Sequence, residues 1–60
     1  MAKVVVAKLP IKAGERIQES SLCLRRASGG LPPAYLPLIA GREAKCDIEA
    51  NTVISLSALR

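Results

Sequence analysis

Apolar residues occur along this chain in short groups, separated by residues that favour turns. The longest uninterrupted apolar run covers only residues 4–7, and no segment keeps a 3.6-residue apolar period for more than about one helical turn. Short apolar runs bounded by Gly, Pro and Asn are typical of short strands. The pattern therefore predicts a mostly β domain with single helical turns and no long helix.

The sequence contains an internal repeat at a spacing of 37 positions. Residues 7–22 align without a gap on residues 44–59, and seven of the sixteen positions are identical. The identical pairs are Ala7/Ala44, Lys8/Lys45, Ile11/Ile48, Ala13/Ala50, Ile17/Ile54, Ser20/Ser57 and Leu22/Leu59. Gly14 aligns on Asn51, and these are the residue types that best tolerate a left-handed backbone. The repeat predicts two similar halves related by a pseudo-two-fold axis around one core.

Each half is expected to contain the same elements in the same order. A short strand (residues 4–8 or 42–46) precedes an inward-facing Ile and a tight turn (residues 12–15 or 49–52) with positive φ at its third residue. A second short strand carries Ile17 or Ile54, and one turn of helix ends on Leu22 or Leu59. The halves cover about residues 4–22 and 42–59 of a single domain, residues 1–60. We expect Ile11, Ile17, Ile48 and Ile54 in its core.

The linker between the halves, residues 23–41, has a different composition. Residues 23–26 continue as a strand, and residues 27–30 form a Gly-rich loop. Pro33 suits the first position of a helical turn, and Pro37 limits that helix to a turn or two. Leu38 and Ile39 are expected to return to the core.

Composition excludes several functions for a chain of 60 residues with a net charge of +4. It has no His, and an independent enzyme of this size without one is improbable. One aromatic residue gives nucleic-acid bases almost nothing to stack on, and no run approaches the roughly 20 apolar residues that span a bilayer. We expect no nucleic-acid or membrane partner and a cytoplasmic location. Cys46 aligns on Leu9 as a small core residue, Cys23 faces the other side of its strand, and both are expected to stay reduced.

The most suggestive polar feature is Arg25-Arg26 followed by Gly29 and Gly30. A guanidinium group is a planar fork of donors, and glycines allow a backbone to approach a ligand closely. Neighbouring strand residues face opposite sides, so one Arg at most points to a given ligand. The alternative is a solvated strand end followed by an ordinary turn.

Three motifs together resemble the SAF domain, the antifreeze-like module at the C-terminus of sialic acid synthases and a homologue of type III antifreeze proteins. They are VVVAKLPIKAGERI at residues 4–17, LRRASGGLPP at 24–33 and AGREAKCDI at 40–48. The middle motif is the more specific to the synthases, although Ala27 stands where they usually have Pro. The resemblance implies a β-clip (pretzel-like) fold.

In the synthases, a TIM barrel uses a divalent metal to condense phosphoenolpyruvate with an N-acyl-mannosamine-type sugar. The SAF domain helps to close the active site of the partner subunit. The resemblance implies that Arg26 contacts the N-acyl group, with Arg25 and Gly30 as weaker candidates, and that the metal belongs to the barrel. This chain would then hold no cofactor and catalyse no reaction by itself.

Two other functions share the fold. In the antifreeze relatives, a flat and largely uncharged surface around the first turn binds ice, whereas residues 12–19 here include four charged side chains. An assembly module of a pilus or flagellar protein has the fold without the Arg-loop motif. The synthase interpretation predicts that Arg26 is exposed and unpaired in the isolated domain, whereas the alternative is that both Arg are surface residues without a function.

Overall fold

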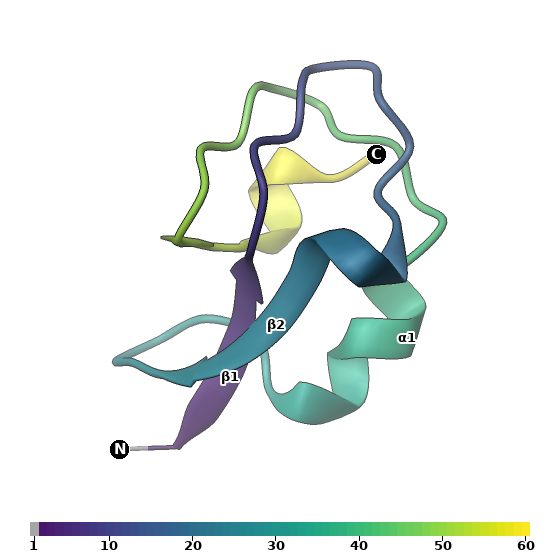
Figure 1. Ribbon diagram of the computed structural model, residues 1–60. Coiled ribbons are helices and arrows are strands. Elements are labelled where there is room, and N and C mark those ends of the chain that lie inside the picture. The colour runs from purple at the N-terminus through teal and green to yellow at the C-terminus, as the bar shows by residue number, and fades with distance from the viewer. Residues whose placement is uncertain (1) are drawn as a thin grey trace.

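The structure is a computed structural model that describes residues 2–60. Three antiparallel strands form one sheet in the order β2-β1-β3, and the remaining regular structure consists of single helical turns (Figure 1). The strands are β1 (Lys3–Ala7), β2 (Leu22–Arg26) and β3 (Thr52–Val53). The helical turns are η1 (Glu19–Ser21), η2 (Pro33–Tyr35), α1 (Leu36–Ile39) and η3 (Leu56–Ala58), of which only α1 is α-helical. The predicted mostly β class is confirmed.

Strand β1 lies at the centre of the sheet. It pairs with all of β2 along one edge and with β3 along the other, where Val6 is opposite Val53. Residues 4–7 are all buried, because both edges and both faces of this strand are covered. The short apolar run in the sequence is therefore a central strand.

The two halves meet at a pair of equivalent residues. The N–H of Ile11 donates to the carbonyl of Ile48 at 2.8 Å, and the N–H of Ile48 donates to the carbonyl of Ile11 at 2.7 Å. Two other backbone hydrogen bonds have a counterpart in the other half, in which the donor number is 37 higher and the acceptor number is 37 lower. Gly14 N to Ala44 O corresponds to Asn51 N to Ala7 O, and Ile17 N to Arg42 O corresponds to Ile54 N to Val5 O. The backbone thus follows the predicted pseudo-two-fold symmetry, with its axis between Ile11 and Ile48.

The core is built from the isoleucines that the repeat predicts. Ile11, Ile17, Ile48 and Ile54 are at most 5% exposed and belong to one buried cluster. The linker contributes Ile39 to the same cluster, at the end of α1. Both halves and the linker therefore share a single hydrophobic core.

Four expectations for individual segments are wrong. The second short strand of each half does not carry its isoleucine, since the first half has only an isolated bridge at Arg16 and β3 ends at Val53, before Ile54. Residues 42–46 form only the isolated bridges of Glu43 and Ala44, because their neighbours are mostly charged and exposed and give a strand little apolar surface to bury. Cys46 is exposed, since the chain bends there after the bridge at Ala44. Leu38 is 61% exposed, because the single turn of α1 places the neighbouring Ile39 toward the core instead.

Replacing one core isoleucine in each half tests the shared core. We expect Ile17→Ala and Ile54→Ala each to lower the free energy of unfolding by about 2–5 kcal/mol, because each change leaves a cavity around a side chain that is 1% exposed. Leu38→Ala is the control, with an expected cost within about 0.5 kcal/mol at an exposed position. Urea denaturation of the three variants provides the measurement. A neutral result at Ile17 or Ile54 would contradict the two-half model at that position.

The turn glycine can be tested against its counterpart in the other half. Gly14 has φ of 84° and Asn51 has φ of 64°, so both adopt the predicted left-handed conformation. A Cβ at Gly14 would meet no atom within 4 Å, so the cost of a side chain there is conformational. Gly14→Val should destabilise the domain by at least about 1–2 kcal/mol, and Gly14→Asn by clearly less. Equal melting temperatures for the two variants would show that the turn does not require this conformation.

Candidate functional site

The two candidate arginines lie at the end of β2, on opposite faces of the sheet. In the register of β1 and β2, Arg25 is opposite Val4 and Arg26 is opposite Lys3. Both guanidinium groups are exposed. The strand ends beside the N-terminal end of β1, at the lower left of Figure 1. The structure therefore brings Lys3 next to Arg26, a neighbour that sequence separation alone does not reveal.

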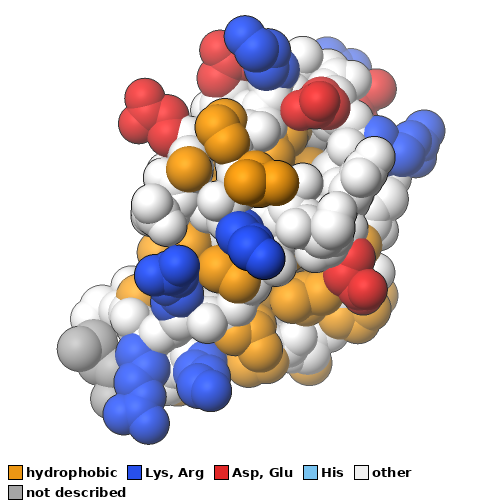
Figure 2. Space-filling model, in the orientation of Figure 1, with side chains coloured by type: hydrophobic (Ala, Val, Ile, Leu, Met, Phe, Trp, Pro, Cys, Tyr) orange, Lys and Arg blue, Asp and Glu red, His pale blue; other side chains and the backbone are white. Residues whose placement is uncertain are grey.

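Arg25 and Arg26 differ from the other arginines in having no side-chain partner in the described part of the chain, residues 2–60. The Nη1 of Arg16 donates to the carbonyl of Gly41 at 2.7 Å, and Arg60 forms an ion pair with Glu43 at 3.4 Å. Arg42 donates to two backbone carbonyls. Within residues 2–60, the guanidinium groups of Arg25 and Arg26 have no hydrogen bond or ion pair. In Figure 2, the Lys and Arg side chains at this end of the molecule have no acidic side chain among them.

The loop after Arg26 is fixed against the sheet by a glycine. Gly29 and Gly30 have φ of 73° and 88°. A Cβ on Gly30 would lie 2.6 Å from Cγ1 of Val53 and 3.2 Å from Cβ of Val4. One residue later, the carbonyl of Leu31 accepts a hydrogen bond from the N–H of Val5 at 2.9 Å. The loop therefore packs against β1 and β3, and a side chain at position 30 would require Val53 or Val4 to move.

A shallow hollow of about 450 Å³ lies beside this loop. Its walls come from the start of the chain, the loop and the prolines that follow. The lining residues are Ala2, Lys3, Val4, Ala27, Ser28, Gly29, Gly30, Pro32 and Pro33. Arg26 is next to the hollow in sequence but does not line it. This end of the domain thus presents exposed donors beside a small concave surface, an arrangement suited to contact with a polar or anionic group.

The structure brings no catalytic group to the arginines. Within residues 2–60, no three acidic or Cys side chains lie close enough together to hold a metal ion. Cys23 is half-buried in β2, and both thiols are free. The exposed guanidinium group of Arg26 offers hydrogen-bond donors and a positive charge to a partner.

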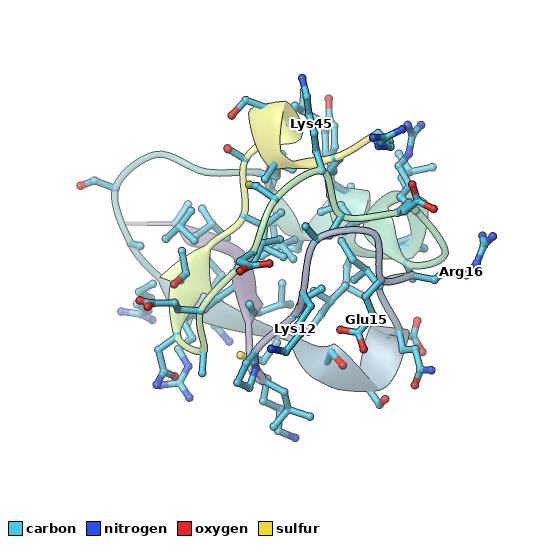
Figure 3. The ribbon with its side chains drawn as sticks, turned by 90° about the horizontal axis from the view of Figure 1, so that it is seen from above. Lys12, Glu15, Arg16 and Lys45 are labelled. Carbon is cyan, nitrogen blue, oxygen red and sulfur yellow. The ribbon has the colours of Figure 1, made fainter. Side chains whose placement is uncertain are left out.

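The first turn carries a second group of charged residues. The N–H of Lys12 donates to Oε1 of Glu15 at 3.0 Å, and the N–H of Ala13 donates to Oδ1 of Asp47 at 2.7 Å. In Figure 3, Lys12 and Glu15 lie side by side, whereas Arg16 and Lys45 point away in other directions. Two carboxylates thus stabilise the turn by accepting from its backbone. The role of Asp47 was not anticipated, because it crosses from one half to the other.

The chain belongs to the SAF domain family. The family model for the SAF domain matches residues 2–60, almost the whole sequence. No curated protein matches the sequence. SAF domains are accessory modules without catalytic activity of their own. Of the helices within residues 2–60, none has the length and apolar character needed to cross a membrane.

Substitutions at the two glycines of this loop distinguish the cost of a packing clash from the cost of backbone strain. Gly29→Ala and Gly30→Ala both place a side chain at positive φ, but a Cβ at Gly29 meets nothing within 4 Å. We expect Gly30→Ala to cost at least about 1 kcal/mol more than Gly29→Ala, because Val53 or Val4 must move to admit the methyl group. Thermal unfolding of both variants measures the difference. If the two melting temperatures agree, the loop does not pack on the sheet as described.

Proposed function

We propose that this SAF domain is the accessory domain of an enzyme of the sialic acid synthase type. In this proposal it caps the active site of the partner subunit, and Arg26 contacts the N-acyl group of the amino-sugar substrate. The observation that carries the proposal is the exposed Arg26, which has no hydrogen bond or ion pair to residues 2–60, within the motif of residues 24–33. The TIM barrel of the partner subunit would supply the metal and the phosphoenolpyruvate site.

The chemistry of the guanidinium group supports a role in substrate contact. An acyl oxygen is a neutral acceptor, and a hydrogen bond from a charged donor to it strengthens when a docked surface excludes water. Arg26 loses no internal interaction when it turns toward such a surface, whereas Arg16 and Arg60 would each have to break one. Arg25 faces the other side of the sheet and is the natural internal control.

The other two functions fit the observations less well. The charged side chains of the first turn carry firmly held water, which a flat ice-binding surface must avoid. An assembly module would share the fold but lacks the Arg-loop motif that residues 24–33 carry here. The amino-sugar interpretation gives the unpaired arginine a role and does not require an uncharged surface at the first turn.

A chimera tests the proposal directly. The SAF domain of a sialic acid synthase is replaced by this chain, and kcat/KM for the N-acyl-mannosamine substrate is measured in the dimeric enzyme. Arg26→Ala should lower kcat/KM by about 10-fold or more, because a hydrogen bond from a charged donor contributes roughly 1.5–3 kcal/mol. Arg25→Ala should change kcat/KM by less than about 3-fold.

Two further measurements distinguish the loss of a substrate contact from a loss of folding stability. The melting temperatures of both variants should stay within about 2 °C of the parent, since both side chains are exposed and unpaired. Arg26→Lys should restore only part of the activity, because an ammonium group lacks the planar fork. An active chimera in which Arg25→Ala and Arg26→Ala have equal, small effects would refute the assignment of Arg26.

A further inference from the structure

The outer edge of the sheet at β2 is open. Strand β1 covers one side of β2, and no other segment within residues 2–60 pairs with its other side. Leu24, in the middle of the strand, is 39% exposed. A five-residue edge of this kind is a template on which another chain can form a strand.

The hydrogen bonds at the two ends of the β1–β2 ladder show which backbone groups are free. Lys8 donates to the carbonyl of Ser21, and Ala27 donates to the carbonyl of Ala2. Hydrogen-bonded pairs alternate along an antiparallel ladder, so the pairs between these two are Val4/Arg25 and Val6/Cys23. The N–H and C=O groups of Leu24 and Arg26 therefore point away from β1, to the open edge.

The charges along this edge are all of one sign. Arg25 and Arg26 lie at its end, and Lys3 is directly opposite Arg26 on β1. Like charges in opposite positions repel each other and are relieved by an anionic neighbour. None of the three side chains has a hydrogen bond or ion pair within residues 2–60, whereas Arg60, at the far end of the chain, already pairs with Glu43.

We propose that the open edge of β2 binds an extended acidic segment of another protein as an added antiparallel strand. The N–H and C=O groups of Leu24 and Arg26 supply the backbone hydrogen bonds. Two consecutive acidic residues of the segment lie opposite Arg25 and Arg26, one on each face of the sheet. This inference goes beyond the proposed function, since it concerns the edge of the strand and not the sugar contact.

A second copy of this chain is a poorer occupant of the edge. Antiparallel pairing of two β2 strands centred on Leu24 would place Arg26 of each copy beside Leu22 of the other. Lys3, Arg25 and Arg26 of both copies would then lie on one six-stranded sheet, so that like charges gather at the new interface. Charge complementarity therefore favours the acidic segment.

The peptide acetyl-EEVTV-amide is a probe with the matching register, because its two acidic residues lie opposite Arg26 and Arg25. We expect saturable shifts of the Leu24 and Arg26 amide resonances in ¹H–¹⁵N NMR titrations of the 60-residue chain. N-methylation of the valine at position 3 blocks the N–H that faces Leu24 and should abolish binding. N-methylation of the threonine at position 4, whose N–H faces away, should be tolerated. Failure of the parent peptide to bind at about 5 mM, or equal effects of the two methyl groups, would refute strand addition.

Substitutions in the domain, instead of in the peptide, test the same contacts. Arg25→Gln and Arg26→Gln should each weaken binding about 2- to 5-fold, the range for an exposed ion pair. Leu24→Pro removes a free donor without breaking the ladder to β1 and should abolish binding, whereas Leu24→Ala keeps the donor and should retain it. Binding of acetyl-KKVTV-amide with equal affinity would overturn the charge argument. Dimerisation of the chain that Leu24→Pro prevents would identify a second copy as the occupant and overturn the proposal.

Discussion

The two hydrogen bonds exchanged by Ile11 and Ile48 hold the fold together, because they join the halves at the pseudo-two-fold axis. A chain of 60 residues buries too little surface to maintain two separate cores. Each half instead contributes two isoleucines to one shared cluster, and each turn donates a backbone N–H to the other half, Gly14 to Ala44 and Asn51 to Ala7. Neither half can bury its apolar face without the other.

The symmetry ends where the linker begins, and this difference creates the candidate site. Residues 22–26 extend the sheet as β2, and the loop that follows returns across β1 and β3 at Gly30. This path places the end of β2 beside the start of β1 (Figure 1), where Arg26 is opposite Lys3 in the strand register. The other arginines are tied to backbone or to Glu43, so they contribute to the domain itself. Arg25 and Arg26 contribute nothing comparable, which is why we assign them to intermolecular contacts.

The two proposals share the guanidinium group of Arg26. The amino-sugar contact depends on this group alone, while strand addition also uses the backbone of Leu24 and Arg26 and the charge of Arg25 at the open edge. An accessory domain that caps another subunit needs both a residue that reaches the substrate and a surface that docks. Both groups lie on β2, so docking along the strand would also fix the position of its terminal arginine.

The sequence by itself determined the repeat, the four core isoleucines, the left-handed turns at Gly14 and Asn51 and the mostly β class, because apolar spacing and turn chemistry are local properties. Cys46, Leu38 and the segment of residues 42–46 were predicted wrongly, since burial depends on which side of a bend or helical turn faces the core. The pairing of Lys3 with Arg26 and the closeness of Gly30 to Val53 also required the tertiary structure. They depend on strand register and on the path of a loop, and residues far apart in sequence fix both through contacts that no local pattern records.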